Sequence, residues 1–500
     1  MQNLVDLLNG FHTAISPLNL FWCFIGSLIG TLVGVLPGIG PTSAIAILLP
    51  VTAFLPPIPA IIMLAGVYYG SQYGGSTTSI LINMPGEIAS VVTCYDGYEL
   101  TKRGRAGPAL AIAAISSFIA GTVSLLGLVF FAPVLATIAL EAFGPPEYFA
   151  LFCFSLTMAV SLSGRSLVRG MISVFFGFLV GAIGLDPISG TARFTFGQTG
   201  LLRGTELISA CIGLFALAEV AINLEKEIKA VYSARLKGLL PSMEDLRRCA
   251  GAFWRSTVIG FFIGVIPGMT TSIAAFMCYD IEKKVSKNPE KFGHGAIEGV
   301  AAPEGANNSA TSGAFVPLFA FGIPPSPSLA VLLGAFMIYG LQPGPLLFEM
   351  HGEFTWAVIA SMYLGNVMLL VLNLPLVGLW ARIATIRYGL LAPLVIIFSV
   401  VGAYGIRNSM FDVGTAVVFG FIGYMMKKLR IPTAPMVLAL VLGPKVEPAF
   451  YQSLALSNGS FAIFYQRPIA LAGLVTAVAA VLFTLWVRRR HPEVPMEADE

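Results

Sequence analysis

The sequence predicts an all-α polytopic membrane protein. Of its 500 residues, 56% are hydrophobic and 11% are charged, whereas about 25% of the residues of a soluble domain are charged. Apolar runs of roughly 17–30 residues recur along the chain, separated by short charged or proline-rich loops, as expected for membrane-crossing helices. A β-barrel would show a weaker alternation of polar and apolar residues.

The chain also contains an internal repeat. "GVLPGIGPTS" (34–43) interrupts an apolar stretch, and "GFFIGVIPGMTTS" (260–272) echoes it. In each half a second polar stretch follows, "YYGSQYGGSTTS" (68–79) or "PEGANNSATSG" (303–313). We therefore expect two repeats, each with a Pro-Gly turn and then a broken helix at the membrane midplane.

The distribution of Lys and Arg predicts the topology, because positively charged loops stay in the cytoplasm. All basic clusters become cytoplasmic if residues 17–50 and 252–281 are re-entrant hairpins with the Pro-Gly turns at their tips. The N-terminus then lies outside and the C-terminus inside. The remaining apolar segments make about 11 transmembrane helices: 59–84, 108–138, 147–163, 170–186, 206–223, 310–342, 354–381, 388–403, 411–426, 432–447 and 465–487.

This topology divides the chain into four parts. The first repeat, 1–224, contains hairpin 17–50, broken helix 59–84 and five crossings, so the second repeat begins from the opposite face and is inverted. A cytoplasmic amphipathic linker spans 225–251. The second repeat, 252–487, contains hairpin 252–281, broken helix 310–342 and an extra terminal helix. A cytoplasmic tail, 488–500, follows.

The interruptions are candidate binding sites, because an opened helix within a membrane must face protein, water or a ligand. Helix N-termini favour anions, and unwound carbonyl groups favour Na⁺. The candidate substrate- or ion-binding residues are Pro37, Gly38, Gly40, Thr42, Ser43, Gln72, Gly75, Ser76, Thr77, Thr78, Pro267, Gly268, Thr270, Thr271, Ser272, Glu304, Asn307, Asn308, Ser309 and Thr311.

Each candidate also has a structural interpretation. Ser and Thr hydroxyls can bond back to their own helices, and Glu304 can be a hydrated residue at the cytoplasmic mouth instead of an ion ligand or proton carrier. The glycines spaced by four have a structural role, since small residues let helices pack closely. They are Gly26, Gly30, Gly34 and Gly38 in one half, and Gly260, Gly264 and Gly268 in the other.

Enzyme signatures are absent from the sequence. "GVLPGIGPTS" lacks the lysine of a phosphate-binding loop, and there is no H-E-x-x-H metalloprotease motif. The six cysteines show no C-x-x-C pair or zinc-ligand spacing. We expect no enzymatic activity, no cofactor and no metal site, although Na⁺ can bind near the helix breaks.

The motifs "GVLPGIGPTSAIAILLP", "GVYYGSQYGGSTTSILINMPGE" and "GVIPGMTTS" resemble the large membrane subunit of the tripartite tricarboxylate transporter family. The resemblance covers about residues 15–485. It matches Pro37 to Thr42, their repeat Pro267 to Thr271, and the signatures Tyr69 to Thr78 and Glu304 to Ser309.

The resemblance implies a multi-pass protein of the bacterial inner membrane with two partners, a small four-helix membrane subunit and a periplasmic substrate-binding protein. It implies secondary active uptake of di- or tricarboxylates or related organic acids, driven by Na⁺ or H⁺. We expect alternating access by elevator motion, with a rocking bundle as the other mechanism. A stand-alone organic anion channel or exporter, and a scaffold without transport activity, remain alternatives.

Overall fold

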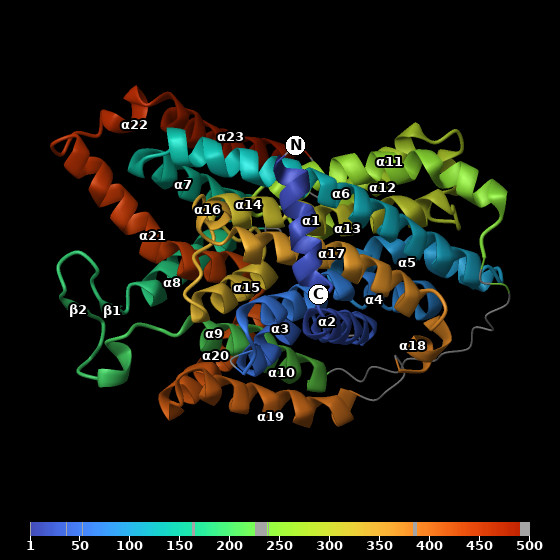
Figure 1. Ribbon diagram of the computed structural model, residues 1–500, viewed down its shortest axis with the longest axis horizontal. Helices are drawn as coiled ribbons and strands as arrows, with labels where there is room; N and C mark the ends of the chain where they lie inside the picture. Colours follow the sequence, from blue (N-terminus) through green and yellow to red (C-terminus); the bar gives the residue numbers. More distant parts are fainter. Residues whose placement is uncertain are drawn as a thin grey trace.

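A computed structural model describes residues 2–36, 38–52, 54–162, 166–225, 238, 240–383 and 388–490. Helices form nearly all of this fold, and a two-residue antiparallel ladder, β1 (Gly184–Leu185) with β2 (Ala192–Arg193), projects from one end (Figure 1). This agrees with the predicted all-α class.

The helices of the first half are α1 (Gln2–Ala14), α2 (Pro17–Val35), α3 (Pro41–Thr52), α4 (Pro57–Ile82), η1 (Ile88–Ser90), α5 (Val91–Lys102), α6 (Ala106–Ala142), α7 (Pro145–Leu162), α8 (Leu167–Gly181), η2 (Thr199–Leu201), α9 (Leu207–Cys211), the π-helix η3 (Ile212–Leu217) and α10 (Ala218–Glu225). Those of the second half are α11 (Met243–Val265), α12 (Thr271–Val285), η4 (Pro289–Lys291), α13 (Glu298–Gly313), α14 (Phe315–Phe321), α15 (Pro327–Ile338), α16 (Leu347–Met350), α17 (Gly352–Asn373), α18 (Val377–Ile383), α19 (Tyr388–Arg407), α20 (Met410–Lys428), α21 (Ala434–Leu456), α22 (Ile463–Gln466) and α23 (Pro468–Arg490).

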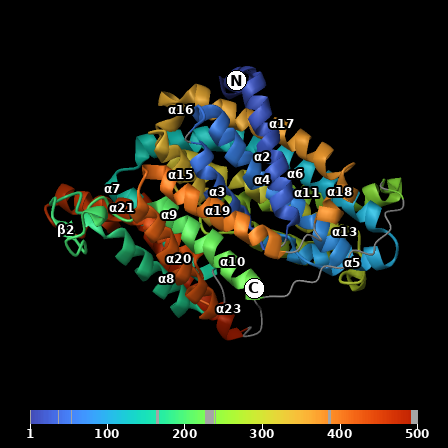
Figure 2. The ribbon, with the colours of Figure 1, turned by 90° about the horizontal axis from the view of Figure 1, so that it is seen from below.

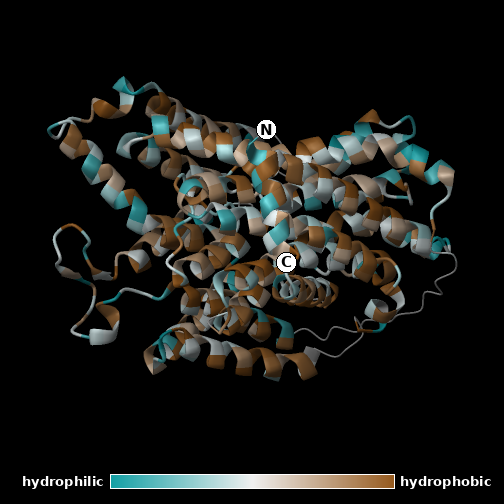
Figure 3. Ribbon diagram, in the orientation of Figure 1, coloured by the Kyte–Doolittle hydropathy of each residue, from teal (hydrophilic) through white to brown (hydrophobic). Residues whose placement is uncertain are grey.

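Eight helical segments in the described part of the chain are long and apolar enough to cross a membrane. They are α2, α6, α7, 207–225, α17, 389–407, α20 and 468–486. The outer helices keep large apolar side chains exposed, among them Leu390 (69%) on α19 and Phe483 (63%) on α23. Hydrophobic residues cover these helices, and hydrophilic residues gather near helix ends (Figure 3). The protein is therefore a multi-pass membrane protein.

The two Pro-Gly motifs separate helices in the same way. Residues 36–40 separate α2 from α3, and residues 266–270 separate α11 from α12. Gly38 and Gly268 both adopt the left-handed region, with φ of 87° and 83°, which residues with a Cβ rarely enter. At 19 residues, α2 is about 28 Å long, so it is not limited to half the membrane. The re-entrant course of these segments stays a prediction.

The two polar stretches are not broken, contrary to the prediction. α4 is continuous through Gln72 and Thr78, and α13 is continuous through Asn307 and Thr311. The interruptions come later, at 83–87 and 322–326, where a left-handed residue ends α4 and α14 and prolines prevent their continuation. The second of them lies inside the predicted broken helix 310–342, whereas the predicted broken helix 59–84 is the continuous α4. Ser and Thr in the two stretches bond within their helices, so this composition does not require a break.

Helices α4 and α13 lie at the centre of the molecule and pack against a neighbour through small residues. α2 lies along α4 (Figure 2), and a Cβ on Gly34 would lie 2.2 Å from the Ser71 carbonyl oxygen. α11 lies along α13, where a Cβ on Gly264 would lie 2.2 Å from the Ala310 carbonyl oxygen. The predicted small-residue faces are confirmed within α2 and α11, where they bring backbone against backbone, whereas Gly38 and Gly268 lie in the turns after these helices.

Other helix limits also differ from those predicted. α17 ends at Asn373 because Pro375 follows, and α18 is a separate helix. α11 begins at Met243, inside the predicted linker, where Ser242 and Asp245 form a capping box. Helices α1 and α5 were not predicted. Most of the predicted linker, 226–237 and 239, and residues 491–500 of the tail lie outside the described residues.

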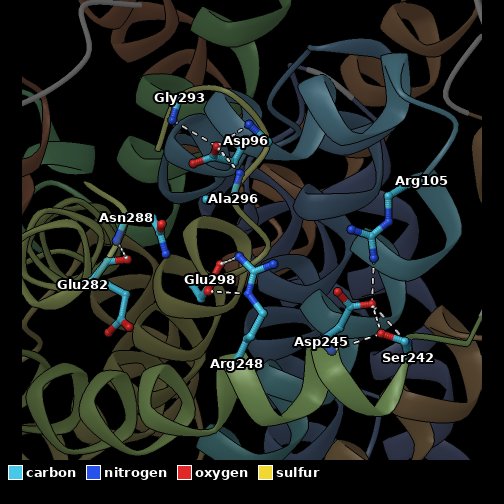
Figure 4. A network of polar contacts seen from close by, with 12 residues as sticks. Asp96, Arg105, Ser242, Asp245, Arg248, Glu282, Asn288, Gly293, Ala296 and Glu298 are labelled. Atoms are coloured by element: carbon cyan, nitrogen blue, oxygen red, sulfur yellow. Dashed lines mark hydrogen bonds and ion pairs between the residues drawn. The ribbon is translucent and has the colours of Figure 1, made fainter. Parts of the chain in front are cut away.

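A polar network near the start of α11 joins the two halves (Figure 4). Asp96, fully buried on α5, accepts hydrogen bonds from the backbone nitrogens of Gly293 (3.0 Å), Gly295 (2.7 Å) and Ala296 (2.7 Å), and from the Tyr279 hydroxyl (2.9 Å). We call this set the Asp96 anchor. Two ion pairs, Arg105 to Asp245 and Arg248 to Glu298, lie beside it. The loop before α13 is thereby fixed to the first half.

Candidate functional site

Three helix N-termini meet in the interior. Thr270 is the N-cap of α12 and Ser326 the N-cap of α15, and both line one pocket with Gly268 and residues 324–327. The Gly268 nitrogen donates to the Pro325 carbonyl oxygen (3.3 Å), which holds the second Pro-Gly turn against the α14–α15 loop. Helix N-termini carry partial positive charge and unpaired N–H groups, so the pocket favours an anion.

The first Pro-Gly motif reaches the same place. The Thr42 hydroxyl lies 2.7 Å from the Ser328 hydroxyl. Thr42 is the second residue of α3 and Ser328 the second residue of α15, and a proline begins each helix. The first turns of α3 and α15 are therefore in contact, and segments more than 200 residues apart in sequence contribute to one region.

A lysine lies at the other end of the α14–α15 loop. Lys445, on α21, donates to the carbonyl oxygen of Gly322, the residue that ends α14 (3.2 Å). No carboxylate pairs with this ammonium group among the described residues. The interruptions at 36–40, 83–87, 266–270 and 322–326 contain no Lys or Arg. The structure brings Lys445 to one of them from a distant helix.

Polar side chains of α4, α13 and the loop between α4 and α5 form a cluster in which three members are buried and Glu87 is half-buried. The carboxylate cluster consists of Gln72, Glu87, Glu304 and Asn307. The Asn307 amide donates to Glu87 Oε1 (2.9 Å). With its amide nitrogen turned toward Glu87, Gln72 lies 2.8 Å from both Glu87 oxygens and 2.7 Å from Asn307 Oδ1. Two amides thus stabilise Glu87 as an anion.

Glu304 is less well satisfied than Glu87. It is 1% exposed, and its Oε1 accepts a hydrogen bond from the Thr93 hydroxyl (2.5 Å). Its Oε2 is buried without a hydrogen-bond partner in the described part of the chain. Its depth in the fold argues against a hydrated residue at the cytoplasmic mouth. A buried carboxylate oxygen without a donor is costly unless it holds a proton or a cation.

Tyr68 connects the pocket with the carboxylate cluster. It is on α4, one turn before Gln72, and lies beside Ser326 and within electrostatic reach of Glu87. The anion-favouring pocket and the two carboxylates, Glu87 and Glu304, are therefore neighbours. The pocket favours an anion and the carboxylates favour a cation. Because the two lie close together, the binding of an anion and the binding of a cation can depend on each other.

The other predicted residues divide by their contacts. Ser76, Thr78 and Thr311 bond to carbonyl groups of their own helices, which is the structural interpretation. Ser309 donates to Thr257 of α11 (2.5 Å), and Asn308 donates to Ser117 of α6 (2.7 Å). The remaining predicted residues are buried or lie near the turns, and none of the site contacts described above involves them. They are Ser43, Thr77, Pro267, Thr271 and Ser272.

The glycines predicted for the site differ in their surroundings. The Gly38 carbonyl oxygen accepts a hydrogen bond from Asn223 (2.9 Å). A Cβ on Gly75 would lie 2.7 Å from Glu87 Cγ, so a glycine there makes room for the carboxylate. Gly40 has open space around it. Pro37 lies outside the described residues.

Sequence reasoning missed five residues of the site: Glu87, Thr93, Ser326, Ser328 and Lys445. Glu87 ends the quoted motif "GVYYGSQYGGSTTSILINMPGE", and Ser326 follows Pro324 and Pro325, so an acid or hydroxyl at a proline-rich interruption was the available signal. Lys445 had no local signal, because only the packing of α21 brings it to Gly322. No group of three or more His, Cys, Asp or Glu side chains suited to a metal ion occurs among the residues that the structure describes.

Comparison with known proteins gives three findings. A family model described as "Tripartite tricarboxylate transporter TctA family" matches residues 20–438. An "Uncharacterized 52.8 kDa protein in TAR-I ttuC' 3'region" of Agrobacterium vitis is 45% identical over 503 residues, covering 100% of both chains. An "Uncharacterized protein in TAR-II ttuC' 3'region" of the same organism is 42% identical over 244 residues, which is 48% of this chain and 100% of that protein. No solved structure matches the chain significantly.

Proposed function

Because the chain belongs to the tripartite tricarboxylate transporter TctA family, we propose that it is the large membrane subunit of a binding-protein-dependent secondary transporter. It imports di- or tricarboxylates or related organic acids, and a Na⁺ or H⁺ gradient drives the import. The observation that carries this proposal is the convergence of the α3, α12 and α15 N-termini beside two carboxylates, Glu304, which is buried, and Glu87, which is half-buried.

The pocket suits a substrate that must be released after binding. Its polar groups are helix N-termini and the hydroxyls of Thr270 and Ser326, which stabilise a carboxylate without a buried ion pair. Lys445 supplies a full positive charge at the far end of the α14–α15 loop. A substrate with two or three carboxylates can therefore interact with both ends of this loop.

Alternating access fits the arrangement of the two halves. The second Pro-Gly motif lines the pocket, the first contacts the start of α15 beside it, and the carboxylate cluster comes from both central helices. We propose elevator motion of a unit that contains these elements against a scaffold built on α6 and α17. A rocking bundle is the other mechanism.

The proposed partners are a small four-helix membrane subunit and a periplasmic binding protein, in the bacterial inner membrane. The deciding experiment is uptake of labelled citrate into proteoliposomes that contain the complex. Accumulation that saturates and requires the added binding protein supports the proposal. Binding-protein-independent uptake indicates a stand-alone channel or exporter, and absence of uptake indicates a scaffold.

Lys445→Met is expected to reduce citrate uptake about tenfold, the effect of losing roughly 1.4 kcal/mol of binding free energy. Uptake of a monocarboxylate should fall less, because it does not occupy both ends of the loop. Lys445→Arg should recover part of the activity. Lys284→Met, which removes a lysine on the surface (72% exposed side chain), is the control. Equal uptake by Lys445→Met and wild type would exclude this role.

We propose an orientation with the N-terminus outside and the C-terminus inside from the loop charges, and ion pairs between distant segments support the relative topology that goes with it. Arg105 to Asp245 joins two segments predicted to be cytoplasmic, and Arg467 to Glu147 joins two predicted to be external. Each pair requires its two segments to lie at the same end of the molecule.

If the repeats are inverted hairpins, cysteines at Phe54 and Lys287 should react with impermeant thiol reagents from opposite sides of the membrane. Both positions are exposed, with Phe54 at 89%. The parent protein, whose native cysteines are free and mostly buried, gives the background. Labelling of both positions from one side would contradict the inverted arrangement.

A further inference from the structure

We infer that one monovalent cation, Na⁺ or H⁺, binds at Glu304 Oε2, between Glu304 and Glu87, and is the ion whose gradient drives transport. The inference deepens the proposed function and depends on it for the role of the ion. The binding site itself follows from the contacts of the two carboxylates, the hydroxyls beside them and the surrounding helices.

The two carboxylates differ in the number of hydrogen-bond donors that stabilise their negative charge. Glu87 accepts hydrogen bonds from two amides, so its negative charge is stabilised at both oxygens. Glu304 has one donor, Thr93, at Oε1 and none at Oε2. Glu304 Oε2 therefore has no donor or positive charge beside it, and the cation is placed at this atom.

One further hydroxyl lies beside Glu304, and it has a single proton to donate. Ser76 lies next to this carboxylate, but its proton is donated to the Tyr73 carbonyl oxygen (2.8 Å). When Ser76 donates to Tyr73, its lone pairs are left for the space near Glu304. An acceptor facing another acceptor is unfavourable unless a proton or a cation lies between them.

No fixed positive charge competes for this position. The other titratable groups near the pair are Tyr73 and Cys94 beside Glu304, and Tyr68 beside Glu87. None is a base that carries positive charge, and no lysine or arginine pairs with either carboxylate in the described part of the chain. Two ionised carboxylates this close, with Glu304 fully buried and Glu87 half-buried, would repel each other, so the site requires a mobile cation.

Cation binding at this site also changes the affinity of the neighbouring pocket for an anion. When the cation binds, it neutralises one carboxylate close to the pocket and so lowers the repulsion of an incoming anion. When it leaves, both carboxylates oppose the anion, and the two ligands are released together. By linkage, the substrate must raise the affinity for the cation by the same factor.

The test measures cation binding to the purified full-length protein without any substrate. Radioactive Na⁺ is titrated in choline buffer, and protonated carboxylic acid is followed by infrared spectroscopy as the pH is lowered. If the ion is Na⁺, wild type binds it saturably and Glu304→Gln loses at least about tenfold in affinity. If the ion is H⁺, Na⁺ does not bind and Glu304→Gln lacks a carboxylic acid band that wild type shows.

Matched variants separate site loss from misfolding. Glu353→Gln removes an exposed carboxylate on α17 and should behave as wild type. Glu304→Asp keeps the charge but withdraws it by one methylene, so it should bind the cation more weakly while remaining folded. If wild type neither binds Na⁺ saturably nor loses a carboxylic acid band on substitution of Glu304, the inference is wrong.

Transport assays distinguish this failure from that of the proposed function. Citrate uptake that responds equally to the gradients in wild type and Glu304→Gln overturns the cation site and leaves the transporter proposal standing. Cation binding without carboxylate uptake keeps the site and overturns the proposed function. If both are correct, Glu304→Gln still exchanges citrate across the membrane but does not accumulate it.

Discussion

Gly34→Ala is expected to prevent stable packing of α2 on α4. The added Cβ would lie 2.2 Å from the Ser71 carbonyl oxygen and 2.9 Å from Gly74 Cα. Both are backbone atoms, so the clash is relieved only by separating the helices. Overpacking in a protein interior costs about 1–3 kcal/mol where side chains can yield, and a contact between backbones should exceed this range. We expect loss of most folded protein.

The measurement is thermal unfolding of the purified protein in detergent, together with the yield of monodisperse protein. Gly414→Ala is the matched control, because Gly414 is also a helical glycine but has open space where its Cβ would be. It should be neutral or slightly stabilising. Gly264→Ala, in the second half, should be as damaging as Gly34→Ala. A Gly34→Ala protein as stable as wild type would contradict the packing described here.

Asp96→Ala is expected to cost about 3 kcal/mol or more, because a hydrogen bond to a charged group contributes roughly 1.5–3 kcal/mol and the buried carboxylate accepts four. Three backbone N–H groups would lose their acceptor. Asp96→Asn should be milder, since the amide oxygen can still accept from the three nitrogens.

Asp280→Ala provides the comparison for this prediction. Asp280 is an aspartate on α12 in an exposed ion pair with Lys284, and such pairs contribute about 0–1 kcal/mol. Denaturation should therefore rank wild type with Asp280→Ala, then Asp96→Asn, then Asp96→Ala. Equal stability of Asp96→Ala and Asp280→Ala would show that the Asp96 anchor does not hold the loop before α13.

The membrane class, the family and the close glycine contacts could be predicted because each has a local signal in the sequence. The apolar runs gave most helices to within a few residues, and glycines spaced by four occupy one helix face. The position of the second interruptions could not be read from Gly, Ser and Asn content. Proline and a left-handed residue determine where α4 and α14 end, whereas Ser and Thr stay within the helices.

The candidate site was predictable in part for a similar reason. Thr42, Thr270 and Glu304 follow recognisable motifs, and the structure places them in or next to the site. The residues that lie beside them in the site come from elsewhere in the chain: Ser328 for Thr42, Ser326 for Thr270 and Thr93 for Glu304. These pairings depend on how helices from the two halves pack together, and no local pattern encodes them.

The carboxylate cluster has a consequence for how the protein is made. Glu87 leaves the ribosome 220 residues before Asn307, the amide that donates to it. Until the second half is synthesised, α4 and the loop after it must stay in the bilayer or beside an insertion factor with this acid unsatisfied. We expect a nascent chain that ends before α13 to be held by the insertion machinery or degraded, and release should follow synthesis of α13.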